Sequence, residues 1–239
     1  PDIVCLEEVD HFHDYFLPKL KANGYTGIFL AKPDSPCLRV PGHTSPDGCA
    51  VFVNDSRLEV TQSHEVILKD DRGSSSNQVA IIISLNDLET KRKFLAAVTH
   101  LKAKEGNEKI RLAQGKDLLL NLRQMKCDMG SATKVPLTLI CGDFNATPNE
   151  PIYQEMRENG FKSSYLSAAK HEAHFTTWKF RPKGEVCHTI DYLWHSSGFI
   201  PRNFLAIPSK DIIGEAALPS VDFPSDHLSL VFDFELSHE

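Results

Sequence analysis

Five separated polar clusters stand where apolar runs of the sequence end or break. They are Leu6-Glu7-Glu8-Val9, Thr99-His100-Leu101-Lys102, Gly142-Asp143-Phe144-Asn145, His188-Thr189-Ile190-Asp191-Tyr192 and Ser225-Asp226-His227. An acid at a strand end usually caps a helix or lies in a solvated turn, so a single cluster would carry little information. Together the five offer oxygen ligands for a hard cation, a base, and groups that meet the charge of a phosphoester. The clusters therefore predict metal-dependent phosphoester chemistry.

Short apolar runs must place these clusters at strand ends. Runs rich in β-branched and aromatic residues predict strands over 3–6, 27–31, 49–53, 60–68, 79–85, 93–101, 135–141, 176–180, 189–194, 199–206 and 228–234. Apolar spacing near 3.6 residues predicts helices over 11–21, 109–125 and 150–159. The helices are too few for regular helix-strand alternation, so this order favours a two-sheet α/β sandwich over a doubly wound parallel sheet.

Size, charge and cysteine usage narrow the class of protein. The 239 residues can bury a sizeable core, and no stretch resembles an interdomain linker, so we expect a single domain over residues 1–239. A net charge of -6 without a Lys/Arg block disfavours extended nucleic-acid binding and suits a small anionic substrate. Six scattered cysteines indicate reduced thiols, and no apolar run approaches the roughly 20 residues of a membrane span. We expect an intracellular monomer in the cytoplasm, the mitochondria or both, with no membrane partner.

The order of the clusters resembles the motif set of the exonuclease-endonuclease-phosphatase superfamily, through the segments LEEVD, VTHLK, CGDFNATP, HTIDY and SDHLSL. Over nearly its whole length the chain is similar to the deadenylase-like branch of that superfamily, through KPDSPC, PDGCAVF, NQVAI, THLKA, TTWKFR and FPSDHLSL. The resemblance implies an α/β sandwich of two sheets, of the DNase I-like type, that hydrolyses phosphate esters with Mg²⁺. It also implies that the family's N-terminal strand, whose Asn helps complete the metal site, is missing from this chain.

The resemblance implies metal and water roles for four residues that match the family's motifs. Glu8 is a magnesium ligand, and Asp226 assists the metal. Asp143 orients or deprotonates the attacking water, and Asn145 steadies the nucleophile or a phosphate oxygen. Positioning and charge stabilisation of this kind are the main demands of phosphoryl transfer.

The resemblance also implies which groups meet the phosphate. His227 contacts the scissile phosphoryl group while Asp191 holds its imidazole in one tautomer, and His100 donates a second hydrogen bond. Four cations beside the motifs bind the phosphates of NADP(H), whose 2'-phosphate is removed: Lys32, Lys102, Lys104 and Arg181. Lys104 stands where relatives carry Arg. Lysine keeps the positive charge but lacks the planar guanidinium group that binds phosphate through two hydrogen bonds. No Gly-rich nicotinamide-binding loop is present, so NADP(H) is expected to be a substrate and not a redox cofactor.

Two other functions stay open at this point. A 3'-exonuclease of the same branch trims poly(A) RNA, and Trp178, Phe180 and Tyr192 are aromatic residues able to stack bases. Their spacing fits alternate core positions of strands better, and the acidic balance favours the small substrate. A catalytically inactive adaptor is the third alternative. The presence of every key polar residue, Glu8 and Asp143 among them, argues against it.

Overall fold

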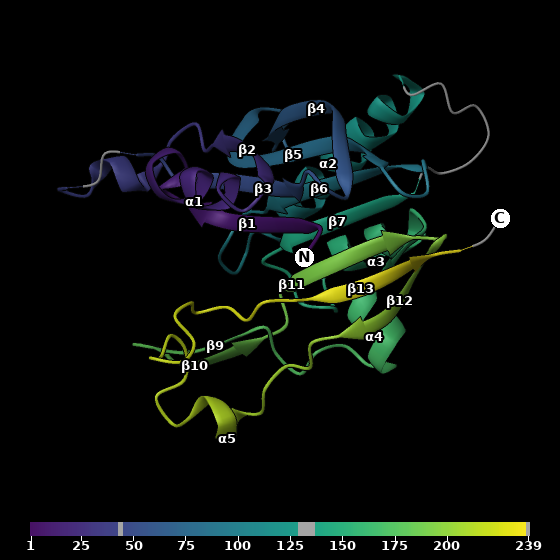
Figure 1. Cartoon of the computed structure of the whole chain (residues 1–239). Coiled ribbons are helices and arrows are strands. Elements are labelled where there is room, and N and C mark those ends of the chain that lie inside the picture. The colour runs from purple at the N-terminus through teal and green to yellow at the C-terminus, as the bar shows by residue number, and fades with distance from the viewer. Residues whose placement is uncertain (43–44, 129–136, 238–239) are drawn as a thin grey trace.

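A six-stranded sheet forms the centre of the computed structural model, which describes residues 1–42, 45–128 and 137–237 (Figure 1). The strand order is β4-β5-β6-β7-β11-β8. The strands are β4 (Leu58–Lys69), β5 (Ser75–Asp87), β6 (Lys93–His100), β7 (Thr138–Asp143), β8 (Phe161–Ser163) and β11 (Asp191–Ser196). Neighbours are antiparallel except β6 and β7, which run parallel and are connected through α2 (Glu108–Asp128). Both faces of β5 and β6 are covered, so these strands are buried along nearly their whole length.

A three-stranded sheet packs on one face of the central sheet. Its order is β1-β3-β2, with β1 (Ile3–Val9), β2 (Tyr25–Ala31) and β3 (Gly48–Asn54). Alternate residues of β3 and β5, such as Val51 and Ile81, meet in one buried apolar cluster between the two sheets. The outer face of β3 is covered by η1 (Phe12–Phe16), where Phe12 lies against Phe52.

Two helices cover the opposite face of the central sheet. Leu118 and Leu122 of α2 and Ile152 of α3 (Pro151–Glu158) join Trp194 of β11 in a second apolar cluster. Gly115 of α2 lies where α3 approaches, because a Cβ at this position would be 1.9 Å from Ile152 Cδ1. The glycine inside the helix is thus explained by close helix packing. The layers make an α/β sandwich of two sheets, which confirms the fold predicted from the sequence.

The remaining described elements are a hairpin, a further pair of strands and four short helices. They are the hairpin of β9 (Thr177–Arg181) and β10 (Gly184–His188), the pair β12 (Phe199–Phe204) and β13 (Phe232–Leu236), η2 (Pro36–Arg39), and helices α1 (Leu17–Lys21), α4 (Ser164–Ala169) and α5 (Lys210–Ile213). Within the described ranges, no helix combines the length and apolar character needed to cross a membrane.

Several predicted boundaries differ from the structure. The segment predicted as a helix over 11–21 begins with a π-helical turn, and the last strand starts at Phe232 and not at residue 228. The start of the strand predicted over 135–141 lies outside the described residues, and β7 is described from Thr138 onward. The sequence predicted none of five short elements, namely η2, β8, β10, α4 and α5. Elements this short are held by tertiary contacts and carry little periodicity of their own.

Candidate active site

Three neighbouring strands of the central sheet bring His100, Asp143 and Asp191 side by side. His100 of β6 is in register with Asp143 of β7, and Asp143 is in register with Asp191 of β11. Adjacent strands lie about 4.8 Å apart, so residues in one register row are immediate neighbours. Gly142 allows β7 to approach β6, because a Cβ there would lie 1.9 Å from the Thr99 carbonyl oxygen. The sheet register therefore accounts for the convergence of three predicted site residues.

A bulge in β1 turns two consecutive acids toward the same cleft. The pairing of β1 with β3 slips between Leu6 and Val9, and Glu8 has a left-handed φ of 55°. Glu7 and Glu8 consequently both line the cleft, although consecutive strand residues normally face opposite ways. Glu8 Oε1 lies 3.7 Å from Lys32 Nζ and 3.9 Å from His100 Nδ1. Glu7, for which the sequence predicted no role, has a pKa raised well above its usual value by burial, with Asp191 adding to the effect.

Asp191 orients His227. His227 Nδ1 lies 2.9 Å and 3.0 Å from the two carboxylate oxygens of Asp191. Thr176 Oγ1 donates to Asp191 Oδ2 at 2.5 Å and accepts from the backbone N–H groups of Ile190 and Asp191. Burial works to lower the pKa of His227, but the hydrogen bond and charge of Asp191 raise it above its usual value. The imidazole is thus held with Nδ1 toward Asp191, which leaves Nε2 for another partner.

Asp143 and Asn145 form a second hydrogen-bonded unit. Asp143 Oδ1 accepts the backbone N–H of Asn145 at 2.7 Å, and Asn145 Nδ2 donates to Asp143 Oδ2 and to the Leu101 carbonyl oxygen, both at 3.1 Å. Burial and the nearby Asp191 charge raise the pKa of Asp143 to about 8. His100 Nε2 is 3.5 Å from Asp143 Oδ2. Burial and the charge of Lys32 lower the pKa of His100 to about 3, so this imidazole is neutral.

The donor set fits a hard divalent cation. Ligand atoms of Asp143, Asp191 and His227 lie within 4.8 Å of one another, and Glu8 lines the same cleft. The buried His100 Nδ1 has no hydrogen-bond partner among the residues that the structure describes. Carboxylate oxygens are the ligands that Mg²⁺ prefers, and a bound cation offsets the repulsion between crowded carboxylates.

Asp226 lines the cleft beside His227, together with two cations of β9. Asp226 Oδ2 lies 2.5 Å from Lys179 Nζ and 3.5 Å from Arg181 Nη2. This carboxylate is therefore paired with cations and is not part of the cluster of Asp143, Asp191 and His227. Lys179 lines the cleft together with Arg181, and the sequence analysis missed it. The sequence could have predicted this cation, because Lys179 and Arg181 are two residues apart on β9 and therefore lie on the same face of the strand.

Three of the predicted phosphate-binding residues, Lys32, Lys102 and Lys104, do not line the cleft. Lys32 contacts Glu8, but its Nζ lies 2.5 Å from Asp47 Oδ2 and its side chain is nearly buried. Lys102 and Lys104 follow His100 in the next loop and are not among the residues that line the cleft. Their substrate roles remain predictions.

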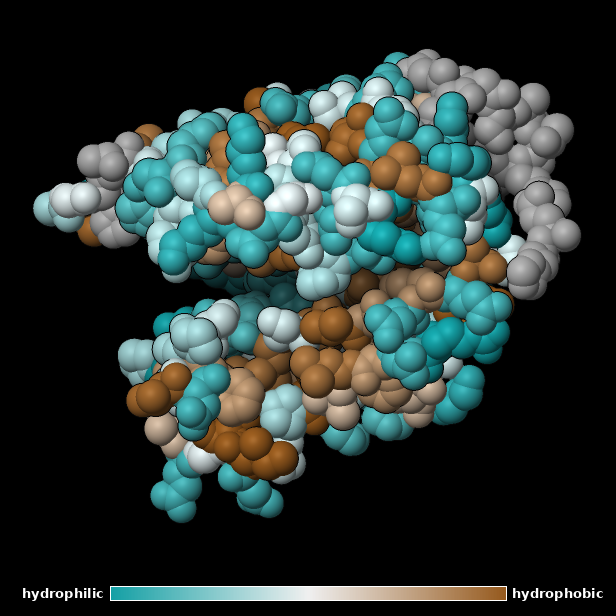
Figure 2. All heavy atoms as spheres, viewed as in Figure 1, coloured by the Kyte–Doolittle hydropathy of each residue, from teal (hydrophilic) through white to brown (hydrophobic). Residues whose placement is uncertain are grey.

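The cleft has a volume of about 650 Å³ and separates two parts of the molecule. Figure 2 shows the surface hollowed between the part that carries β1 and the part that carries β9 and β10. Four apolar residues also line the cleft: Phe180, Leu218, Pro219 and Pro224. Trp178 and Tyr192 are buried, as the core interpretation predicted, but that interpretation was wrong for Phe180, which is 57% exposed.

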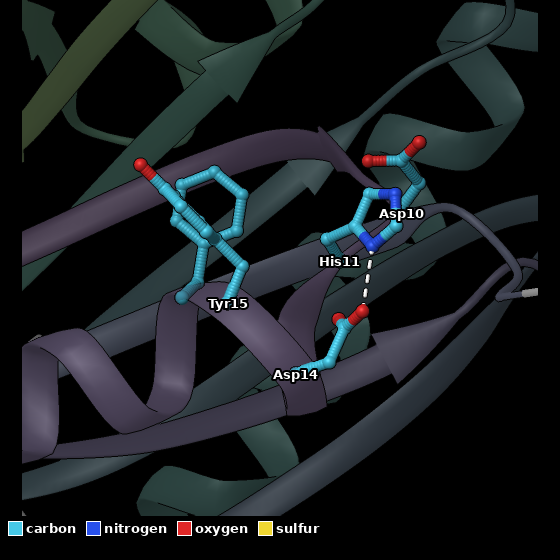
Figure 3. Close-up of a pocket in the computed structure, with 5 residues that line it drawn as sticks. Asp10, His11, Asp14 and Tyr15 are labelled. Carbon is cyan, nitrogen blue, oxygen red and sulfur yellow. Dashed lines mark hydrogen bonds and ion pairs between the residues drawn. The ribbon is translucent and has the colours of Figure 1, made fainter.

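A second hollow lies beside η1 and is lined by Asp10, His11, Asp14, Tyr15 and Phe16 (Figure 3). His11 Nδ1 and Asp14 Oδ2 are 2.8 Å apart, and both side chains are about half exposed. None of the predicted site residues lies in this hollow. The cleft of Asp143 and His227 is therefore the candidate active site.

Known proteins of one family match the chain over nearly all of it. Nocturnin of Xenopus laevis is 45% identical over 100% of this chain and 62% of its own length, and human Nocturnin is 44% identical over 56% of its length. The solved human Nocturnin catalytic domain with bound sulfate anion is 41% identical, with a TM-score of 0.84 over 99% of this chain and 81% of that domain. The chain thus spans little more than half the length of these full relatives.

The Ccr4 3'-5'-exoribonuclease subunit of the CCR4-Not complex from Debaryomyces hansenii is a more distant relative. It is 26% identical over 98% of this chain and 34% of its own length. A model of the endonuclease/exonuclease/phosphatase family matches residues 1–227, a range that contains every residue of the candidate site. The chain therefore belongs to the endonuclease/exonuclease/phosphatase family, as a Nocturnin-like member.

Proposed function

We propose that this chain is a Mg²⁺-dependent phosphatase that removes the 2'-phosphate of NADP⁺ and NADPH. The observation that carries the proposal is the convergence of Asp143, Asp191 and His227 with Glu8 in one cleft whose wall also holds cations. Such a cleft offers a base, an oriented imidazole and a carboxylate for a metal, which are the parts that phosphoester hydrolysis needs.

Each of these side chains has a distinct role in the proposed reaction. Asp143 accepts a proton from the attacking water, and Asn145 orients that carboxylate through its two hydrogen bonds. His227, held at Nδ1 by Asp191, donates from Nε2 to a phosphoryl oxygen. Glu8 holds the metal, and the neutral His100 completes the phosphate contacts. Bound Mg²⁺ supplies charge neutralisation on the phosphoryl oxygens.

The wall of the cleft supports a dinucleotide substrate. Lys179 and Arg181 supply positive charge for additional phosphates, and Phe180 and Leu218 supply apolar surface for a base. The solved Nocturnin domain that this chain resembles bound sulfate, a tetrahedral anion like phosphate. Together these observations favour a small substrate that combines several phosphates with an aromatic base.

Removal of nucleotides from the 3' end of poly(A) is the second candidate function. The exposed Phe180 in the cleft favours it, because an exposed aromatic ring can stack a base of a single strand. The similarity to the Ccr4 exoribonuclease subunit supports the same alternative.

One experiment separates the two candidates. Purified protein is incubated with NADPH or NADP⁺ in Mg²⁺ and inorganic phosphate is measured, while a labelled oligo(A) is incubated in parallel. We expect phosphate release that EDTA abolishes and added Mg²⁺ restores, and no shortening of the oligomer. Shortening of oligo(A) without phosphate release would establish the exonuclease instead, and inactivity on both would favour an adaptor.

Glu8→Gln provides the matched loss-of-function variant, because it keeps the size of the side chain and removes the charge for the metal. Glu65→Gln is its control, since Glu65 is exposed on β4, away from the cleft. We expect the first variant to lose phosphate release and the second to retain it. Equal activity of both variants would contradict the assignment of Glu8.

A further inference from the structure

A buried arginine lies behind the candidate site. Arg111 of α2 is only 1% exposed. Its Nε and Nη2 lie 2.8 Å and 2.7 Å from Glu150 Oε2, and its Nη1 donates to the carbonyl oxygens of Lys102 at 3.0 Å and Lys104 at 2.9 Å. One guanidinium group therefore binds both a carboxylate and the backbone of a loop.

The first loop that Arg111 holds is the one that follows His100. Lys104 in this loop has a left-handed φ of 79°, a conformation that a residue with a side chain adopts only when its surroundings hold it. The loop also touches the site directly, because the Leu101 N–H donates to the Asp143 carbonyl oxygen at 2.9 Å. The Leu101 carbonyl oxygen accepts from Asn145 Nδ2 at 3.1 Å. A shift of this loop would therefore move Asn145 and the carboxylate that Asn145 orients.

The second loop is held through Glu150. Glu150 precedes α3, its Oε1 accepts the Thr147 N–H at 3.3 Å, and its own N–H donates to the Thr147 carbonyl oxygen at 3.0 Å. This loop follows Asp143 and contains Asn145, whose φ of 50° is again left-handed. One oxygen of Glu150 thus contacts the loop of Asp143, and the other contacts Arg111.

We propose that Arg111 and Glu150 are positioning residues, an ion pair with a buried arginine that fixes the loops after β6 and β7 and so sets the geometry of Asp143 and Asn145. Neither residue lines the cleft, so neither is expected to touch the substrate. The expected effect of this pair on turnover rests on the proposed function. A misplacement of about 1 Å at reacting groups typically costs a factor of about one hundred in rate.

If Arg111 and Glu150 served only to link α2 to α3, the bonds of Arg111 to the loop would have no explanation. Lys116 and Glu155 already join the same two helices at the surface, with 3.5 Å between Nζ and Oε2. The Nη1 bonds of Arg111, by contrast, go to loop carbonyl groups and not to α3. Lysine has no planar fork with which to make all these bonds at once.

The test compares Arg111→Lys, Arg111→Met and the double variant Arg111→Met/Glu150→Met with Lys116→Met as the matched control. The double variant guards against misfolding, because it leaves no unpaired buried charge. NADPH turnover is measured per folded molecule, with kcat and KM separated, and amide hydrogen exchange is followed in residues 101–107 and 143–149 without substrate.

We expect kcat to fall about one hundredfold in Arg111→Met and in the double variant, with a smaller fall in Arg111→Lys and little change in KM. Exchange in both loops should become faster, and Lys116→Met should match the parent in every measurement. A purely structural pair would lower the melting temperature and leave kcat of the folded molecules unchanged, and that result would overturn the proposal. Failure of the double variant to fold would also overturn the proposal. If the parent protein hydrolysed neither NADPH nor oligo(A), the proposed function would fail, and unchanged exchange in the two loops would separately refute the positioning role.

Discussion

Replacement of Asp191 by Asn removes the negative charge that faces His227 and keeps the size of the side chain. Thr176 Oγ1 accepts two backbone N–H groups and so uses its own hydrogen to donate to Asp191 Oδ2. The Asn must therefore place its carbonyl oxygen at that position. Its amide nitrogen then takes the position of Oδ1, 3.0 Å from His227 Nδ1, where two donors meet if the imidazole is protonated.

The magnitude follows from the bond that is lost. A hydrogen bond to a charged group contributes about 1.5–3 kcal/mol, and each 1.4 kcal/mol corresponds to about a factor of ten. We therefore expect kcat/KM of Asp191→Asn to fall roughly ten- to 150-fold. Burial works to lower the pKa of His227, and Asp191 raises it. Loss of the charge lowers the pKa, so the alkaline limb of the pH profile, where protonated His227 is lost, should move to lower pH.

The assay is phosphate release from NADPH as a function of pH. Asp233→Asn is the control. Asp233 is an exposed residue of β13, and its carboxylate accepts a hydrogen bond from Asn203. An Asp191→Asn protein with the rate and pH profile of the parent would refute the assigned role of the Asp191–His227 pair.

Three further predictions concern the cleft wall, the sheet register and a buried imidazole. Lys179→Met should raise KM for NADPH about tenfold in steady-state kinetics, since a cation of the cleft wall is lost; an equal change in the exposed Lys183→Met would contradict this. Gly142→Ala should lower the free energy of unfolding in urea by about 3 kcal/mol or more, because its Cβ would meet the Thr99 carbonyl oxygen; an unchanged midpoint would be inconsistent with the register. Burial lowers the pKa of His195, so the native state binds fewer protons and stability should fall as pH drops below about 6.5. His195→Gln should make the melting temperature depend less on pH. A variant whose melting temperature falls with pH as steeply as that of the parent would argue against this role of His195.

The fold was predictable to the extent that each strand carries its own local pattern. The apolar runs that become β5, β6 and β7 are buried on both faces, so composition alone located them. Their ends carried the polar clusters, and the sheet register then placed His100, Asp143 and Asp191 in one row. The sequence predicts which residues end the strands, and the resemblance to a known family predicted that they converge.

Features that depend on contacts distant in sequence were not predictable. The bulge that turns both Glu7 and Glu8 into the cleft is a property of the pairing of β1 with β3. Phe180 follows an alternating strand pattern, yet it is exposed because β9 pairs only with β10 among the described strands and one of its faces borders the cleft. The pairing of Lys179 with Asp226 joins segments 47 residues apart and leaves no local signal.

In the proposed reaction, water activated in the cleft of Asp143 and His227 attacks the phosphorus of a phosphate ester. Hydrolysis of NADPH in water labelled with a heavy oxygen isotope tests this directly, with mass spectrometry of both products. We expect the label in the released inorganic phosphate and none in the NADH. Label in the ribose hydroxyl group of NADH, or no hydrolysis at all, would contradict the attack of water on phosphorus.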